Sequence, residues 1–345
     1  MTEIITQKNE QTITQIITQA IPQSKTEYLA DYCGCSIFIK RDDLIPFSFG
    51  GNKVRIAGEI MKEITAGGYT ALITYGSPGS NMNRAAACSA AAAGISCYAV
   101  IKMEDDEDTG HFNNELLVKK SGAEIVYCTR DNVRESVEEV VLRSKAKGER
   151  PYYIYGDSTG QGNEAVLMRA SFNEYREITA YEREAGEDFD HIVLTVGTGM
   201  TAGGLCAAIL LSGGKERITG ISAARPSETA LGAIKKNLRK VYGLDCPDGI
   251  ISVRDDYLCG GYGKYDRYIE AVIKRVREDT GICLDPTYTG KAFAGLLKEA
   301  QAGRISGRVL FIHTGGYPVY ADWAEGDRSS GSGSGRTACP YGAFR

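Results

Sequence analysis

Short apolar runs alternate along the chain with longer segments in which apolar residues recur at helical spacing. We expect strands at residues 36–40, 71–74, 96–101, 123–127, 152–155, 191–196, 218–223 and 309–313. We expect helices at residues 54–64, 85–93, 113–120, 133–146 and 205–211. The run at 191–196 is almost continuously apolar, which is typical of a parallel strand covered on both faces. The alternation therefore predicts an α/β protein with mainly parallel sheets.

Composition narrows the class of protein. The chain has 345 residues, which is enough for two domains, and 43% are apolar and 24% charged, as in soluble globular proteins. A net charge of -4 argues against a nucleic-acid surface, and no apolar run is long enough to span a membrane. The N-terminus lacks a signal-peptide pattern, so we expect a cytoplasmic protein. The Gly/Ser-rich segment 329–335 is flexible by composition.

Cysteine spacing argues against a structural metal. None of the 10 cysteines forms a Cys-x-x-Cys pair, so a zinc site is poorly supported and we expect no metal.

A lysine stands where a glycine turn enters a predicted helix, in Gly50-Gly51-Asn52-Lys53. Glycine lets the backbone approach a flat ligand closely. A lysine held there can lose its proton when partly desolvated and attack a carbonyl, as a Schiff-base lysine does. Alternatively, Lys53 is an ordinary solvated lysine after a turn.

Two glycine-rich loops join a strand to a helix. Residues 197–204 would present backbone N–H groups to a phosphate, although they match neither a Walker A loop nor a dinucleotide fingerprint. In residues 76–84, Ser80 and Asn81 lie near a helix start that could hold a carboxylate. Alternatively, the first loop is a tight turn, and Ser80 and Asn81 are simple N-caps. Together with Lys53, the loops suggest an amino acid linked to pyridoxal phosphate.

With these residues in view, the chain resembles the pyridoxal-phosphate (PLP) enzymes of fold type II, which are similar to the tryptophan synthase β subunit. More narrowly, it resembles the D-cysteine desulfhydrase and 1-aminocyclopropane-1-carboxylate deaminase family. The matching blocks occur in order at residues 40–43, 50–55, 80–84, 197–199, 262–263, 285–291 and 313–316.

The resemblance implies two open parallel-sheet domains with a PLP cleft between them. The larger, cofactor-binding domain would comprise 1–53 and 166–345, and the smaller, inserted domain would comprise 54–165. Ligands often bind in such clefts. The family also implies a homodimer, which is an analogy.

The resemblance also implies roles for individual residues. Lys53 would form the Schiff base and move the Cα proton. Asn52 and Asn81 would contact the cofactor, and Asn81 would hydrogen-bond the cofactor's ring oxygen. Ser80 would receive the substrate carboxylate. The phosphate would be held by the loop residues Gly197, Thr198, Gly199, Met200, Thr201 and Ala202.

Two tyrosines complete the expected catalytic set. Tyr288, together with Tyr262, would face the substrate as acid, base or hydrogen-bond donor. A phenol is a poor acid in isolation, so a neighbour would have to tune it. Alternatively, either tyrosine is an aromatic core residue.

The residues expected at the pyridine nitrogen favour one reaction over another. Deaminases of the family carry Glu and Leu where this chain has Thr289 and Thr314. A carboxylate would keep the ring nitrogen protonated, whereas a hydroxyl pairs with a neutral nitrogen and makes a weaker electron sink. That sink is adequate for β-elimination, while opening an unactivated cyclopropane is harder. The threonine pair therefore favours β-elimination.

The chain departs from the family in three places, one of which is the atypical Ser77-Pro78 before Gly79. Ile56 replaces a basic residue that often contacts the phosphate, and residues 156–164 differ from a plainer stretch that borders the active site. Asp157 and Gln161 in that stretch either are ordinary loop residues or reflect another leaving group.

The sequence thus predicts a PLP-dependent lyase that acts on a small β-substituted amino acid. D-Cysteine, giving pyruvate, ammonia and hydrogen sulfide, is the best single candidate. Cysteate, chloroalanine, ring-opening deamination of 1-aminocyclopropane-1-carboxylate, β-replacement and racemisation are alternatives within enzymes. A non-catalytic binding protein on the same scaffold is the alternative from another class.

Overall fold

The computed structural model describes residues 23–103 and 112–329. The expected absence of a signal peptide and the flexible Gly/Ser-rich tail concern residues that lie outside this range, apart from Ser329. No helix in the described ranges is both long enough and apolar enough to cross a membrane. The described residues form two compact units, and each contains its own wholly or mainly parallel sheet.

The larger unit comprises residues 23–45, 49–52 and 168–329 of the described chain. Its six strands lie in the order β1-β2-β10-β7-β8-β9, and every neighbouring pair is parallel except β1 and β2. The strands are β1 (Thr26–Tyr32), β2 (Cys35–Lys40), β7 (His191–Val196), β8 (Arg217–Ser222), β9 (Ile251–Arg254) and β10 (Gly307–Ile312). The helical elements are η1 (Asp42–Leu44), α6 (Glu164–Ala185), α7 (Met200–Ser212), α8 (Ser227–Tyr242), α9 (Arg267–Thr280), α10 (Thr289–Gln301) and α11 (Tyr317–Ser329).

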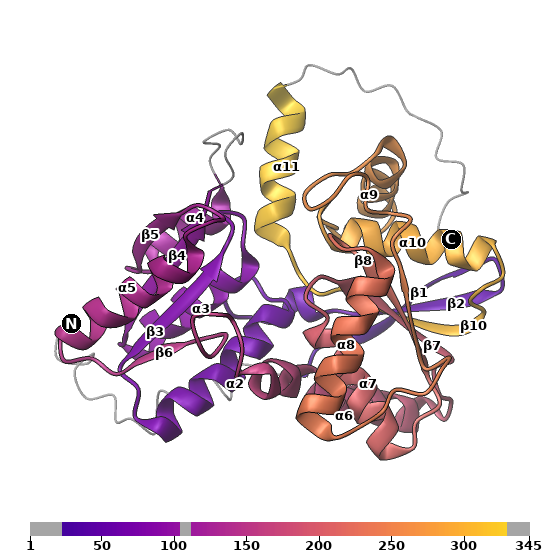
Figure 1. The fold of residues 1–345 in the computed structure, drawn as a ribbon. Coiled ribbons are helices and arrows are strands. Elements are labelled where there is room, and N and C mark those ends of the chain that lie inside the picture. The colour runs from indigo at the N-terminus through magenta and orange to yellow at the C-terminus, as the bar shows by residue number, and fades with distance from the viewer. Residues whose placement is uncertain (1–22, 104–111, 330–345) are drawn as a thin grey trace, which may run out of the picture. The chain divides into compact units, whose positions relative to one another are not determined.

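Helices cover both faces of this larger sheet (Figure 1). Along β10, Leu310 and Ile312 face a core shared with α6, α7 and α8, while Val309 and Phe311 face a core shared with α9 and α10. Because successive side chains of a strand point to opposite faces, both faces need apolar residues. This arrangement explains the continuous apolar run of β7 and confirms the predicted α/β class.

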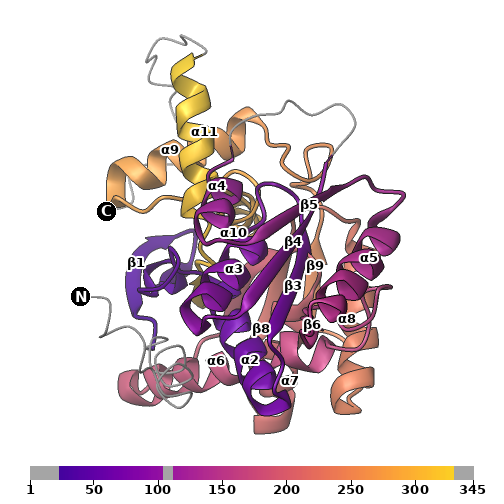
Figure 2. The ribbon, with the colours of Figure 1, turned by 90° about the vertical axis from the view of Figure 1, so that its left-hand side faces the viewer.

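The smaller unit comprises residues 46–48 and Lys53–Leu167 among those described. Its strands β3 (Ala71–Gly76), β4 (Ser96–Lys102), β5 (Glu124–Cys128) and β6 (Pro151–Tyr153) form a parallel sheet in the order β5-β4-β3-β6. Its helices are α2 (Asn52–Gly67), α3 (Asn81–Ala93), α4 (Asn113–Lys120) and α5 (Val133–Ala146). Figure 2 shows α3 and α4 on one side of this sheet and α5 on the other.

Two helices begin earlier than the apolar pattern predicts. Helix α3 begins at Asn81 rather than at residue 85, and α7 begins at Met200 rather than at residue 205. In each case a capping residue starts the helix directly after the loop: Ser80 caps α3, and Gly199, at φ +88°, precedes α7. Periodicity does not detect such a start, because polar residues and glycines interrupt the apolar pattern in the first turn of each helix.

Candidate active site

The start of α2 is held by a close contact between two glycine turns of the larger unit. Gly51, at φ +97°, lies so near the loop after β10 that an added Cβ would be 2.7 Å from the carbonyl oxygen of Thr314. Gly315, at φ +92°, approaches Gly51 equally closely, and the backbone N–H of Asn52 donates to the Thr314 carbonyl at 3.1 Å. Only glycine fits both positions. The contact sets Asn52 against Thr314, and Lys53 is the next residue along the chain.

His313 fixes the turn that carries Thr314. Its imidazole is buried, Nδ1 accepts from the Gly315 N–H at 3.2 Å, and Nε2 lies 3.1 Å from the Cys283 carbonyl oxygen. Those partners assign a neutral ring with the proton on Nε2. Burial lowers the pKa of His313, which is consistent with that neutral form.

Lys53 occupies the first turn of α2 and is half-buried. Burial penalises its charged form and lowers the pKa of the amine from 10.5 to about 8. The partial burial and the lowered pKa both argue against the alternative of an ordinary solvated lysine. At neutral pH the neutral fraction of this amine is therefore larger than for a solvated lysine, which favours a role as nucleophile or base.

The glycine loop after β7 leads directly into α7. Gly199 is packed so tightly that an added Cβ would be 2.7 Å from Ile234 Cγ1. The first-turn N–H groups of a helix lack intrahelical acceptors, so the start of α7 can receive an anion. Thr201 lies in this turn, where its hydroxyl oxygen accepts from Asn52 Nδ2 at 3.0 Å, and it retains its own proton for donation. These donors fit the phosphate group of a cofactor.

The helix start at α3 belongs to the smaller unit. Ser80 caps it, because its Oγ accepts from the Asn83 N–H at 3.2 Å. The carbonyl oxygen of the neighbouring Asn81 side chain accepts from Arg84 Nη2 at 3.3 Å and from Asn114 Nδ2 at 3.1 Å. Two donors on that oxygen fix the orientation of the amide, so the NH₂ group of Asn81 is directed away from them as an available donor. The capping role of Ser80 is confirmed, and it leaves the hydroxyl proton free to donate.

Thr289 and Thr314 differ in what their hydroxyls already bind. Thr289 Oγ1 donates to Asp285 Oδ2 at 2.7 Å and accepts from the Asp285 N–H at 2.8 Å. Asp285 is fully buried, and its other oxygen accepts the backbone N–H groups of Thr287 and Tyr288. The Thr314 hydroxyl is almost buried and makes no side-chain hydrogen bond within the described residues. Thr314 is therefore the threonine with a proton still to donate.

Burial raises the pKa of Asp285, although hydrogen bonds from Thr289 and Tyr288 act in the opposite direction. The raising effect is the larger one, because it reflects complete removal of the carboxyl group from water.

The two expected tyrosines lie together. Tyr288 donates its hydroxyl to that of Tyr262 at 2.9 Å, and the rings meet edge to face at 5.8 Å between centroids. The side chain of Tyr262 is 45% exposed, so the alternative of an aromatic core residue is wrong for this tyrosine. Tyr288 is half-buried. Each phenol therefore has the other as a hydrogen-bonding neighbour.

Lys291 supports the loop that carries Tyr262, and sequence reasoning assigned it no role. Its fully buried ammonium donates to the carbonyl oxygens of Leu258 and Gly261, both at 2.9 Å, and of Ala223 at 3.2 Å. A lysine is buried in this way only when its donors are paired. The block 285–291 was the available signal, but the three carbonyl partners are distant in sequence.

Two of the three departures from the family pattern have structural roles in this chain. Ile56 is 4% exposed and belongs to the apolar core. Asp157 Oδ1 accepts from the Thr159 N–H, the Thr159 hydroxyl and the Gln161 N–H, so this carboxylate organises its own loop. Of the two alternatives for Asp157, these bonds favour an ordinary loop residue.

The candidate residues divide between the units. The smaller unit carries Lys53, Ser80 and Asn81, while the larger unit carries the phosphate loop, both tyrosines and both threonines. Asn114, which orients Asn81, is a further residue that the sequence did not indicate, because no motif surrounds it.

Two curated relatives are similar to this chain over most of its length. The chain is similar to D-cysteine desulfhydrase from Yersinia enterocolitica, with 32% identity over 88% of this chain and 93% of the relative. It is also similar to D-cysteine desulfhydrase from Serratia proteamaculans, with 29% identity over 88% of this chain and 93% of the relative.

Solved structures show the same architecture. A crystal structure described as an ACC deaminase homologue superimposes with a TM-score of 0.76 at 26% identity, covering 92% of this chain and 98% of the other. O-ureido-L-serine synthase shares the fold, with a TM-score of 0.61 at 17% identity over 93% of this chain and 96% of the other. Residues 17–315 match the family described as pyridoxal-phosphate dependent enzymes. With that match and the relatives' near-complete coverage, the chain belongs to the pyridoxal-phosphate-dependent enzyme family and uses this cofactor.

Proposed function

We propose that this protein is a lyase that catalyses β-elimination on a small β-substituted amino acid, with D-cysteine as substrate. The net reaction takes D-cysteine and water to pyruvate, ammonia and hydrogen sulfide. The C–S and Cα–H bonds break, and water replaces the amino group when the released enamine hydrolyses. Relatives named D-cysteine desulfhydrase support this choice of substrate.

One observation carries the choice of reaction. The hydroxyl of Thr289 and both oxygens of Asp285 are engaged with each other and with backbone N–H groups. The Thr314 hydroxyl is then the donor we assign to the ring nitrogen of the cofactor. A neutral donor keeps that nitrogen unprotonated, which suits elimination of a good leaving group better than ring opening.

Lys53 and Asn81 would act on the reacting end of the bound cofactor. Pyridoxal phosphate, when bound, supplies an electron sink that stabilises negative charge at the substrate Cα. The neutral amine of Lys53, with its pKa near 8, would remove the Cα proton. The amide NH₂ of Asn81 would donate to the cofactor's ring oxygen, because its carbonyl oxygen is already held by Arg84 and Asn114.

The remaining residues would bind and orient. Thr201 and the N–H groups of Gly199–Ala202 would hold the phosphate, and Ser80 would donate to the substrate carboxylate. The hydrogen-bonded pair of Tyr288 and Tyr262 would deliver a proton to the departing sulfur.

A substrate panel tests this proposal. Purified holoenzyme is assayed with D- and L-cysteine, cysteate, chloroalanine and 1-aminocyclopropane-1-carboxylate, while pyruvate, 2-oxobutanoate and sulfide are measured. We expect pyruvate and sulfide in equal amounts from D-cysteine, and no turnover by Lys53→Ala. Production of 2-oxobutanoate without pyruvate would instead establish the deaminase, and no turnover of any substrate would favour a binding protein.

We also propose that the enzyme works as a cytoplasmic homodimer, by analogy with its family. Light scattering coupled to size-exclusion chromatography measures the mass directly, and a monomeric mass would contradict the dimer. Fractionation of the source cells tests the location.

A further inference from the structure

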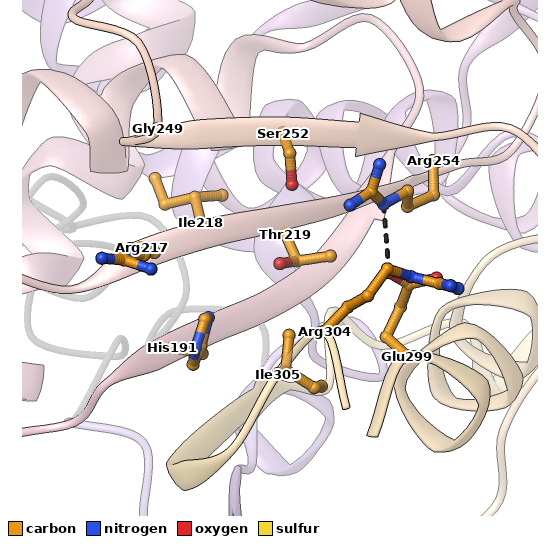
Figure 3. Close-up of a pocket in the computed structure, with 10 residues that line it drawn as sticks. All are labelled: His191, Arg217, Ile218, Thr219, Gly249, Ser252, Arg254, Glu299, Arg304 and Ile305. Atoms are coloured by element: carbon orange, nitrogen blue, oxygen red, sulfur yellow. Dashed lines mark hydrogen bonds and ion pairs between the residues drawn. The ribbon is translucent and has the colours of Figure 1, made fainter. Parts of the chain in front are cut away.

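A second polar pocket lies in the larger unit, away from the phosphate loop. Its volume is about 150 Å³, and it is bounded by β7, β8 and β9 together with the end of α10 (Figure 3). His191 and Arg217, the first residues of β7 and β8, line it, whereas the phosphate loop follows the last residue of β7. Strands rise about 3.3 Å per residue, so the length of β7 separates the two places by about 17 Å. The pocket is therefore a separate site.

Positive charge dominates the lining. Fully buried Glu299 accepts from Arg254 Nε at 3.0 Å and from Arg304 Nε and Nη2 at 2.7 and 2.6 Å. One carboxylate thus faces two guanidinium groups. Arg217 adds a third guanidinium, and it has no ion pair among the residues that the structure describes. Three positive charges less one negative charge leave a surplus of two.

The hydrogen-bonding groups left over in the pocket are mostly donors. Both oxygens of Glu299 are occupied, while the terminal nitrogens of Arg254 point towards Ser252 in Figure 3. The hydroxyls of Ser252 and Thr219 make no side-chain hydrogen bond in the described part of the chain. The buried Nδ1 of His191 also lacks a partner there. A ligand rich in acceptors and carrying two negative charges would satisfy these groups together.

The ion pairs around Glu299 alone do not account for this arrangement. A buried carboxylate needs partners, and Arg304 already forms a bidentate ion pair with Glu299. Stabilising Glu299 requires neither Arg217 nor the hydroxyls of Thr219 and Ser252. Burial and the charge of Arg217 also lower the pKa of His191, against the opposing charge of Asp190. This shift favours the neutral imidazole.

We propose that this pocket binds a small phosphate dianion, either inorganic phosphate or the phosphate group of a small ester. Arg217 and the free nitrogens of Arg254 bind the phosphoryl oxygens, with Ser252 and Thr219 as additional donors. A cavity of this volume accommodates a phosphate group and a short substituent.

Calorimetric titration of the holoenzyme with inorganic phosphate tests the proposal. The bound cofactor occupies the phosphate loop, and sodium chloride keeps the ionic strength constant. We expect saturable binding that Arg217→Gln weakens about tenfold or more, as expected for loss of a hydrogen bond between charged groups. Arg217 is exposed and unpaired, so this variant should retain the fold, which thermal unfolding verifies.

Arg239→Gln is the matched control, because Arg239 is an exposed arginine of the same unit that pairs with Asp245 instead. It should leave phosphate affinity unchanged. Absence of saturable binding to the unaltered protein, equal weakening in both variants, or unchanged affinity in Arg217→Gln would overturn the proposal. Titration with glycerol phosphate separates the two sources: tighter binding than inorganic phosphate supports an ester, and equal or weaker binding supports free phosphate.

Discussion

The burial of Lys53 predicts a measurable pH dependence. Only a neutral amine attacks the cofactor's aldehyde, and the pKa of Lys53 is lowered from 10.5 to about 8. The rate of covalent cofactor capture by the apoenzyme should therefore rise as the pH increases through about 8 and then level off. Rapid-mixing measurements of the visible absorbance at a series of pH values give the midpoint. A midpoint near 10.5 would show that the amine is solvated.

Lys53→Ala is the control for this experiment. It removes the amine but keeps the helix, since alanine is a strong helix former. The cofactor should then bind without the pH-dependent covalent absorbance change. If that change persists, another lysine forms the bond.

The two threonines should separate stability from turnover. Thr289→Val removes a hydroxyl that serves buried Asp285, so the free energy of unfolding should fall by about 1–3 kcal/mol. Thr314→Val removes a hydroxyl without a side-chain hydrogen bond among the described residues, so stability should hardly change. Its turnover should fall roughly fivefold to tenfold if this hydroxyl serves the cofactor. Denaturant unfolding of both apoenzymes measures stability, and steady-state kinetics measures turnover. If Thr289→Val instead lowers turnover and Thr314→Val lowers stability, the two threonines have the opposite roles.

The start of α2 depends on backbone proximity at Gly51. Gly51→Ala adds a Cβ 2.7 Å from the Thr314 carbonyl oxygen at a left-handed φ, so unfolding free energy should fall by about 3 kcal/mol or more. Gly34→Ala is matched in φ, at +78°, but its Cβ would meet open space and should cost only about 1–2 kcal/mol. Gly51→Ala should have a lower melting temperature and a weaker affinity for the cofactor than Gly34→Ala. Equal losses in the two variants would mean that strain, not the contact, matters.

The loop that carries Tyr262 depends on the buried ammonium of Lys291. Lys291→Met would leave the carbonyls of Leu258, Gly261 and Ala223 without this donor, costing on the order of 3 kcal/mol. Because the loop would loosen, turnover should fall more than cofactor affinity. The fluorescence of a probe at a Tyr262→Cys position, compared with and without Lys291→Met, reports loop mobility. An unchanged probe signal would contradict this positioning role.

Local pattern predicted elements well where the apolar signal is clear, whether periodic as in α5 or nearly continuous as in β7. Helix α5 has the predicted bounds 133–146, and β7 has the predicted bounds 191–196. The apolar pattern missed the starts of α3 and α7, because polar residues and glycines interrupt it in their first turns. It also missed β1, whose pairing with β2 is antiparallel. The hydrogen bonds that distinguish Thr289 from Thr314 also escaped it. They depend on Asp285 being buried, which no local pattern reveals.

At the scale of the whole molecule, the proposed cofactor contacts come from residues of both units. A ligand that binds only the folded state protects every segment whose opening would release it. Removing the cofactor should therefore speed amide hydrogen exchange at the start of α3, around Asn81, and at the start of α7, around Thr201. Mass spectrometry of peptic fragments from holo- and apoenzyme measures both regions at once. Strand β5 and helix α9, which carry no proposed contact, serve as internal references. Protection confined to the α7 region would show that Asn81 does not bind the cofactor, and that another residue of the chain must take its assigned role.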